Sequence, residues 1–209
     1  MIRAARRSIL LVFSVVGVVT VMLFLGWWQV DGPGRPETPM SPSSSGLPIP
    51  LYKMDFQLTD HFAQTVGPES WIGSPTLVFF GFTYCPDVCP MTLANISGWL
   101  EELGDEASSL RVVFISVDPD RDTVQAMADY VSNFHPAITG YRGTAKQTAR
   151  AAEAFNVRYE RVSSESGYTV NHSASVFIFD TKGDFVSTID YHESGEFAVP
   201  KIRRGLQLQ

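Results

Sequence analysis

From about residue 50 onward, apolar residues fall into short continuous runs and helical periods that alternate along the chain. Residues 76–82 and 110–117 are almost uninterrupted apolar runs, which is typical of strands buried on both faces of a sheet. Helices are predicted in three segments: residues 90–103, 123–134 and 144–155. Further strands are predicted at residues 157–162, 175–179 and 185–189. This alternation predicts an α/β layered domain, with a short final helix after Glu193.

Near the N-terminus, residues 9–28 form one apolar block without a charged side chain, which predicts a transmembrane anchor. A helix needs roughly 20 apolar residues to cross the hydrocarbon core of a bilayer. Trp27 and Trp28 end the block, as expected at a membrane interface. A cleaved signal peptide, the alternative, would have a shorter apolar region that ends in small residues. By the positive-inside rule, residues 1–8 stay in the cytoplasm because they contain three arginines: Arg3, Arg6 and Arg7.

Residues 29–49 are rich in Pro, Gly and Ser, a composition that resists helix formation and buries no core. We interpret this segment as a semi-extended tether. The predicted layout has four parts: a cytoplasmic N-terminus at residues 1–8, the anchor at 9–28, the tether at 29–49 and a globular domain at 50–209. The short stretch before the anchor leaves little room for an organelle presequence. We therefore expect a single-pass protein of the bacterial inner membrane with its domain in the periplasm, rather than a processed mitochondrial protein.

Charge and cysteine content narrow the function classes. The formal net charge is −6, and beyond residue 49 the chain carries 12 Lys or Arg residues against 20 Asp or Glu residues. This balance gives no basic footprint for nucleic acid, so no nucleic-acid partner is expected. Cys85 and Cys89 are the two cysteines of the chain, too few for a disulfide scaffold. Their close spacing indicates chemistry in an oxidising compartment.

The two cysteines follow the predicted strand at residues 76–82 and open a predicted helix. Pro90 suits the first helical position, where an N–H group would be unpaired anyway, so Cys89 is expected at or near the N-cap. Free N–H groups and the helix dipole lower thiol pKa values there. Two chemistries remain open, thiol–disulfide exchange and metal binding. Two soft thiolates favour Cu(I), for which two Cys and one His make a good three-coordinate site, whereas structural zinc would need four ligands.

Three segments together resemble the motifs of one family. They read F-G-F-T-Y-C-P-D-V-C-P at residues 80–90, S-V-D-P-D-R-D-T at 116–123 and Y-T-V-N-H-S at 168–173. They are similar to the C-P-x-x-C-P, S-V-D-P-x-R-D-T-P and Y-x-V-D-H-S motifs of the Sco (SenC) family, copper-binding assembly factors for the Cu(A) centre of cytochrome c oxidase. The resemblance covers roughly residues 50–195. It implies a thioredoxin-like α/β fold, a central mixed sheet flanked by helices, with an N-terminal strand addition around residues 56–66.

The resemblance implies that Cys85, Cys89 and His172 ligate copper, as Cu(I) and with Cu(II) left open. Cys85 and Cys89 would also form the redox-active pair. The sequence departs from the family motifs at Val124, where a proline is usual, and at Asn171, which replaces the acidic residue before the histidine. The change at Asn171 removes a negative charge beside a cationic metal, so we expect it to weaken or retune the site while ligation persists.

The sequence also predicts roles for His172, for residues near the proposed ligands and for the other histidines. His172 is expected to begin the predicted strand at residues 175–179, and Asp122 and Thr123 are expected to have structural roles, such as a helix cap. Three charged residues are expected to border the copper site or meet a partner: Asp87, Asp118 and Arg121. Three aromatic residues are expected to pack the fold: Phe80, Phe82 and Tyr84. Three histidines are not expected to be ligands: His61, His135 and His192.

The leading functional hypothesis is a copper metallochaperone, rather than an enzyme, that delivers copper to the Cu(A)-bearing subunit of cytochrome c oxidase. A copper donor or a thiol reductase would be a further partner, and the N-terminal helix would hold the protein at the membrane. The alternative is a thiol–disulfide oxidoreductase that acts on exported or oxidase cysteines without carrying copper. A third hypothesis, copper or redox sensing, predicts binding without transfer. His172 discriminates the first two, because thiol exchange tolerates its loss and a three-ligand site does not.

Overall fold

The computed structural model describes residues 16–25, 46–164 and 167–208. The chain divides into two units, residues 1–45 and residues 46–209. In the first unit, residues 16–25 form an exposed helix. The rest of the predicted anchor, the cytoplasmic N-terminus and most of the predicted tether lie outside the described residues. Within the described part of the chain, no helix is long and apolar enough to cross a membrane.

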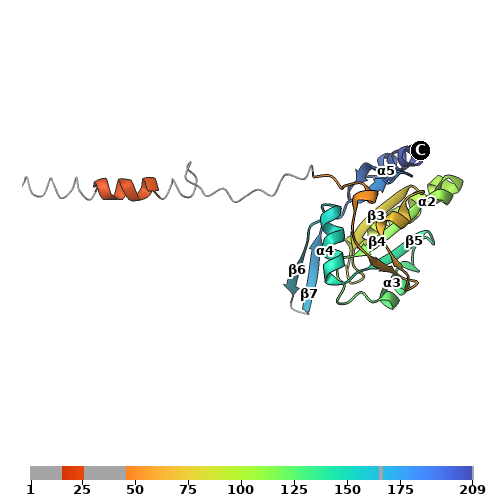
Figure 1. Cartoon of the computed structure of the whole chain (residues 1–209), viewed down its shortest axis with the longest axis horizontal. Coiled ribbons are helices and arrows are strands. Elements are labelled where there is room, and N and C mark those ends of the chain that lie inside the picture. Colours follow the sequence, from red (N-terminus) through yellow and green to blue (C-terminus); the bar gives the residue numbers. More distant parts are fainter. Residues whose placement is uncertain (1–15, 26–45, 165–166, 209) are drawn as a thin grey trace, which may run out of the picture. The chain divides into compact units, whose positions relative to one another are not determined.

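The second unit is built on a mixed seven-stranded sheet, as the sequence predicts (Figure 1). In spatial order its strands are β2 (Thr65–Val66), β1 (Leu58–Asp60), β5 (Ile138–Arg142), β4 (Arg111–Ser116), β3 (Thr76–Gly81), β8 (Val176–Phe179) and β9 (Phe185–Ile189). Strands β3, β4 and β5 run parallel to one another, and the outer pairs are antiparallel. The β1–β2 pair falls within the strand addition expected at residues 56–66.

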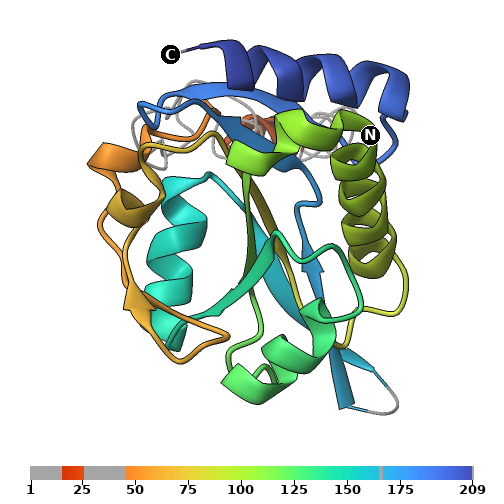
Figure 2. The same cartoon turned by 90° about the vertical axis from the view of Figure 1, so that its right-hand side faces the viewer.

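Helices cover both faces of the sheet (Figure 2). They are α2 (Val88–Leu103), α3 (Val124–Val131), α4 (Ala145–Ala154) and α5 (Gly195–Gln207), with short 3₁₀ turns at Leu51–Lys53, Pro68–Trp71 and Gly104–Ser109. Every residue of β3 is buried, so the strand packs on both sides. The Phe80 ring lies 5.1 Å from that of Phe155 at the end of α4, whereas the Phe79 ring stacks 5.9 Å from that of Phe114, which in turn contacts Tyr130 of α3. This arrangement is the α/β layered domain predicted from the apolar runs.

Two strands escape the sequence prediction. β5 has the sequence Ile-Thr-Gly-Tyr-Arg, a short run interrupted by glycine, and its apolar signal is weak. β7 (Gly167–His172) is polar and only half buried, and it pairs with β6 (Tyr159–Ser164) in a separate two-stranded sheet. The β6–β7 hairpin projects from the body of the unit in Figures 1 and 2. The expectation that His172 begins the following strand was wrong: it is the last residue of β7.

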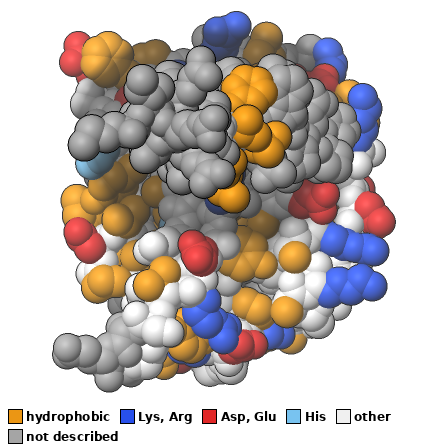
Figure 3. Space-filling model, turned by 90° about the vertical axis from the view of Figure 1, so that its left-hand side faces the viewer, with side chains coloured by type: hydrophobic (Ala, Val, Ile, Leu, Met, Phe, Trp, Pro, Cys, Tyr) orange, Lys and Arg blue, Asp and Glu red, His pale blue; other side chains and the backbone are white. Residues whose placement is uncertain are grey.

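The surface of the second unit carries charges of both signs. On the described surface visible in Figure 3, Lys and Arg side chains lie among Asp and Glu side chains. The largest fully buried side chains are instead aromatic and aliphatic, and they include Trp71, Phe56, Phe79 and Phe80. The core therefore lies between the sheet and its helices, and several polar residues lie in the loops that follow β3 and β4.

Candidate metal centre

The two cysteines lie where β3 passes into α2. Cys85 is in the connecting loop and half buried, and Cys89 is the second residue of α2 and fully buried. The prediction that Pro90 takes the first helical position was wrong by two residues, because α2 begins at Val88 with Asp87 as its N-cap. Pro90 still lies in the first turn, where backbone N–H groups have no intrahelical partner. One such group is used locally, because Cys89 N donates to Cys85 Sγ over 3.4 Å.

His172 meets the cysteines from the β6–β7 hairpin. Its Nε2 lies 3.3 Å from Cys89 Sγ, and the three ligand atoms of Cys85, Cys89 and His172 lie within 4.8 Å of one another. The edge-to-face rings of Phe79 and Phe82 stand 6.3 Å and 5.9 Å from the imidazole and hold it from the sheet side. Within the described residues, this is the one group of three or more His, Cys, Asp or Glu side chains with metal-binding geometry.

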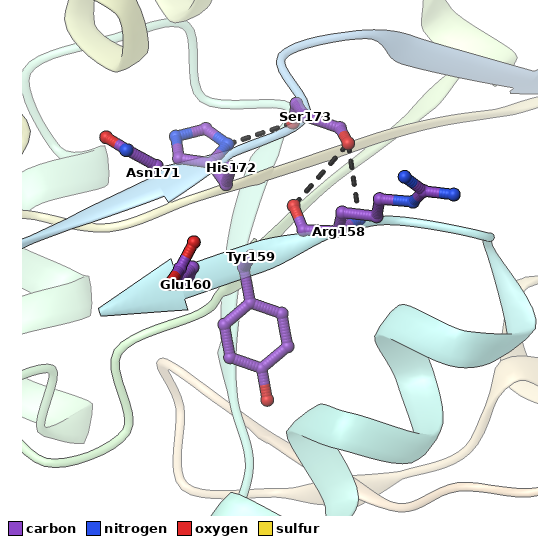
Figure 4. Close-up of a pocket in the computed structure, with 6 residues that line it drawn as sticks. All are labelled: Arg158, Tyr159, Glu160, Asn171, His172 and Ser173. Atoms are coloured by element: carbon purple, nitrogen blue, oxygen red, sulfur yellow. Dashed lines mark hydrogen bonds between the residues drawn. The ribbon is translucent and has the colours of Figure 1, made fainter. Parts of the chain in front are cut away.

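A backbone contact assigns the tautomer of His172. Its Nδ1 lies 2.9 Å from the carbonyl oxygen of Ser173 (Figure 4). Because a carbonyl oxygen can only accept, we assign the ring proton to Nδ1. Nε2 then presents its lone pair toward Cys89. An imidazole held in this way is the usual state of a histidine that ligates a metal.

The pKa values of the two thiols are shifted in opposite directions. The pKa of Cys85 is lowered to about 4, first by the hydrogen bond from the Cys89 thiol and further by the backbone N–H groups of Asp87 and Cys89. The pKa of Cys89 is raised by its hydrogen bond to Cys85, by burial and by the negative charge of Cys85. At neutral pH the pair therefore holds one proton, on Cys89, and Cys85 is a thiolate. Such a thiolate is both a nucleophile and a soft metal ligand.

A short loop between β4 and α3, residues 118–122, is hydrogen-bonded to the segment that precedes Cys85. The buried Asp122 carboxylate accepts hydrogen bonds from Thr83 N, from Thr83 Oγ1 and from Ser116 Oγ. Thr123 caps α3 by accepting from Ala126 N over 3.1 Å. Both residues thus have the structural roles expected from the sequence. Asp122 joins the 118–122 loop to the loop of residues 82–87, the cysteine loop, which carries Cys85.

Asp118 and Arg121 both lie in the 118–122 loop, and Arg121 reaches Tyr84 beside Cys85. Asp118 is fully buried and pairs with Arg121. The Arg121 guanidinium lies 4.8 Å from the ring of Tyr84 and 3.8 Å from that of Tyr168. Phe80 and Phe82 are buried, but the expectation that Tyr84 packs the fold was wrong, because 63% of its surface is exposed. No role was predicted for Tyr168 or Ser173, although both lie in the Y-T-V-N-H-S segment at residues 168–173.

The remaining candidate residues lie outside the ligand triad. Asn171 is exposed and faces Glu160 across the β6–β7 ladder, and both line an open hollow of about 570 Å³ beside His172 (Figure 4). Asp87 is exposed at the start of α2. The other histidines make contacts elsewhere: His61 Nδ1 accepts from Gly140 N, His135 Nδ1 accepts from Ala137 N and His192 packs on Tyr191.

Sequence comparison places these features in a family context. Residues 48–207 match the family model described as SCO1/SenC. The mitochondrial protein SCO2 homolog of Danio rerio is 33% identical over 184 residues, which is 84% of this chain and 65% of that protein. The human mitochondrial protein SCO2 homolog is 35% identical over 154 residues, 72% of this chain and 58% of that protein. The chain thus spans between about half and two thirds of the length of the curated relatives it matches.

Solved structures agree with the fold. Bradyrhizobium japonicum ScoI with copper bound is 37% identical and superposes with a TM-score of 0.67 over 76% of this chain and 98% of that chain. Arabidopsis thaliana ScoI with copper bound is 29% identical, with a TM-score of 0.70 over 74% of this chain and 97% of that chain. The mixed sheet flanked by helices therefore fits the thioredoxin-like α/β fold implied by the sequence motifs.

Proposed function

The chain belongs to the SCO1/SenC family, and from this premise we propose that it binds copper and delivers it to the Cu(A) site of cytochrome c oxidase during assembly. The ligands are Cys85 Sγ, Cys89 Sγ and His172 Nε2. The observation that carries the proposal is the convergence of these three atoms to within 4.8 Å from a loop, a helix and a hairpin. Two thiolates and a neutral imidazole form a soft donor set that suits Cu(I).

The protonation pattern supports stepwise loading of this cargo. Cys85 presents a preformed thiolate that is half exposed, so copper meets it first. Binding then displaces the proton of Cys89, because a metal-ligating thiol is deprotonated. His172 completes the set without proton release, since its Nε2 already carries a lone pair. Transfer reverses the order, and a ligand of the receiving subunit enters on the exposed side of Cys85.

The proposal includes attachment to a bacterial inner membrane, with the copper site in the periplasm. It is supported by the uncharged apolar block at residues 9–28 and by the helix at residues 16–25 within that block. Copper handling at Cu(A) takes place on that side of the membrane in this scheme. Partition of the full chain into membranes, tested by carbonate extraction with and without residues 9–28, checks this part separately.

Copper titration of the reduced full-length chain tests the central claim. We expect one Cu(I) per chain against a competing chelator, loss of binding in Cys85→Ser, and markedly weaker binding in His172→Ala. His61→Asn is the matched control, because it replaces a histidine whose Nδ1 accepts from Gly140 N of β5 and which is not one of the three converging residues. Full copper loading of the Cys85→Ser protein would refute the ligand set. Transfer to an apo Cu(A) domain then separates delivery from sensing.

A second candidate, thiol–disulfide exchange, is favoured by the unequal thiols. The Cys85 thiolate would attack a substrate disulfide and release one substrate thiolate. Cys89, after losing its proton, would attack Cys85 Sγ, form the Cys85–Cys89 disulfide and release the second substrate thiolate, so that two electrons pass to the substrate. His172→Ala decides between the candidates: it should spare disulfide reduction and impair copper transfer.

A further inference from the structure

The β6–β7 hairpin carries a proposed ligand and forms a sheet of its own. Among the described residues, β6 and β7 pair only with each other, so strand pairing does not fix their position on the main sheet. At its base the hairpin is joined by the chain to α4 and β8. Tyr168 lies near the other end of the hairpin, opposite Ser163. Away from its base the hairpin is held by two residues. Arg161 of β6 pairs with Asp120 over 2.6 Å and lies 4.1 Å from the Tyr168 ring. Tyr168 of β7 contacts the 118–122 loop through its ring, its carbonyl oxygen and its hydroxyl.

Those contacts converge on Arg121 of the 118–122 loop. Arg121 Nη1 donates to the carbonyl oxygen of Tyr168 over 3.0 Å, and the guanidinium lies 3.8 Å from the Tyr168 ring centroid. The Tyr168 hydroxyl donates to Asp118 Oδ1 over 2.9 Å, and Asp118 pairs through its other oxygen with Arg121 Nε. The planar guanidinium thus meets a carboxylate, a carbonyl and an aromatic face together, which a lysine ammonium cannot do.

The same loop also holds the cysteine side of the site. Arg121 lies 5.8 Å from the ring of Phe82 and 4.8 Å from that of Tyr84, which directly precedes Cys85. Phe82 in turn stands edge-on to His172. Arg142 of β5 fixes the loop from behind, donating to the carbonyl oxygens of Asp122 over 2.8 Å and Pro119 over 2.9 Å. Arg121 therefore contacts the two segments that must keep their separation for three ligands to meet.

We propose that Arg121 and Tyr168 are positioning residues that set the reach of His172 toward Cys85 and Cys89. Neither touches copper in the proposed site. They act by holding the hairpin and the cysteine loop against the 118–122 loop, which is itself hydrogen-bonded to Arg142 of β5. This inference rests on the proposed function for its copper readout, but the hairpin placement can be measured in the metal-free protein.

The test uses Arg121→Lys, which keeps the charge that Asp118 needs, and Tyr168→Leu as a second variant. Arg203→Lys is the matched control, because Arg203 pairs with an exposed Glu106 away from the site. In the metal-free full chain, we expect amide exchange in β7 to rise about tenfold in Arg121→Lys while β8 stays unchanged. Cu(I) affinity should fall tenfold to a hundredfold, the usual effect of removing an indirect support of a metal ligand.

Coupling to His172 separates positioning from general damage. In a His172→Ala background, Arg121→Lys should weaken Cu(I) binding by less than about twofold, because the ligand it positions is already gone. Equal losses in both backgrounds, or unchanged β7 exchange in both Arg121→Lys and Tyr168→Leu, would overturn the inference. If wild type and His172→Ala bind copper alike, the proposed ligand set fails, and the exchange data alone then decide the positioning role.

Discussion

Gly81 and Cys89 approach so closely that no side chain fits between them. A Cβ built on Gly81, the last residue of β3, would lie 2.8 Å from Cys89 Sγ and 2.8 Å from Cε2 of Phe114. Both neighbours are fully buried and neither is the free end of a flexible chain. Because Gly81 has no side chain, the first turn of α2 can pack closely on the end of β3. Cys89 then lies within 3.3 Å of His172 Nε2.

Gly81→Ala should accordingly destabilise the protein and displace Cys89. Overpacking of a filled core costs about 1–3 kcal/mol, which urea denaturation can resolve. The displaced thiol should react faster with a maleimide than the buried wild-type Cys89 does. Unchanged stability together with an unchanged rate would mean that Phe114 and Cys89 yield freely.

Gly98→Ala provides the matched control for that change. Gly98 lies within α2, and a Cβ there would meet nothing within 4 Å. Because alanine loses less conformational freedom in a helix than glycine, this variant should be more stable by about 0.5–1 kcal/mol. The two substitutions are chemically identical, so opposite signs isolate the effect of space at Gly81.

The lowered pKa of Cys85 predicts an unusual alkylation profile for the reduced, metal-free protein. Since the thiolate reacts and its pKa is about 4, the rate with iodoacetamide should rise around pH 4 and stay level from about pH 6 to 8. An ordinary thiol would still gain rate across that upper range, because its pKa is about 8.5. Peptide mapping assigns the label to Cys85 or Cys89.

The cause of the shift can be tested in the same assay. The hydrogen bond from Cys89 is the largest contribution, so Cys89→Ala should move the midpoint of the profile upward toward the ordinary thiol range. His172→Ala should move the midpoint less. A midpoint near 4 in the Cys89→Ala protein would show that another group stabilises the thiolate.

Asn171 is the site of a third prediction, because it lies directly opposite Glu160 in the β6–β7 ladder. Asn171→Asp restores the acidic residue usual in the family motif but sets two carboxylates across from each other. Like charges in such a pair are unfavourable, so the metal-free protein should lose about 0.2–1 kcal/mol of stability. Copper should offset part of this loss, since the added negative charge is one residue away from the proposed ligand His172, and a larger thermal shift on copper addition would show it.

Glu160→Gln tests the origin of that loss. In its background, Asn171→Asp should cost nothing measurable in the metal-free protein, and 1 M salt should shrink the effect in the parent background. A loss that persists in the double variant would point to the backbone of β7 rather than to charge.

The sequence allowed the main sheet and helices to be predicted where the signal is local. The runs in β3 and β4 are apolar because both faces of these strands are buried, and α2 carries apolar residues at helical spacing for its one buried face. β5 and β7 were missed because one is short and contains glycine and the other is polar. The strand character of β5 depends on β1 and β4, which are distant in sequence. β7 pairs with β6 just before it, but its polar, partly exposed residues give no apolar signal.

The candidate site divides in the same way. Cys85 and Cys89 stand out from spacing and from the helix start, which are local. His172 is 83 residues from Cys89, so only the family motif connected them before the fold was known. The roles of Arg121 and Tyr168 were also hidden, because their contact joins a loop and a hairpin that no periodicity relates.

Asp122 and Thr123 are adjacent, yet they should respond differently to substitution. Thr123→Ala removes a helix cap and should cost about 1 kcal/mol without touching the cysteine loop. Asp122→Asn places an amide N–H₂ group opposite the donors of Thr83 and Ser116. A buried polar group is then left without a partner, which should lower the free energy of unfolding by about 1–3 kcal/mol. Thr83 lies two residues before Cys85, in the loop that leads directly into the first turn of α2, where Cys89 lies. Only Asp122→Asn should therefore also speed alkylation of the buried Cys89. Equal alkylation rates in the two variants would mean that the loop holds its shape without Asp122, and that the carboxylate matters only for Ser116 of β4.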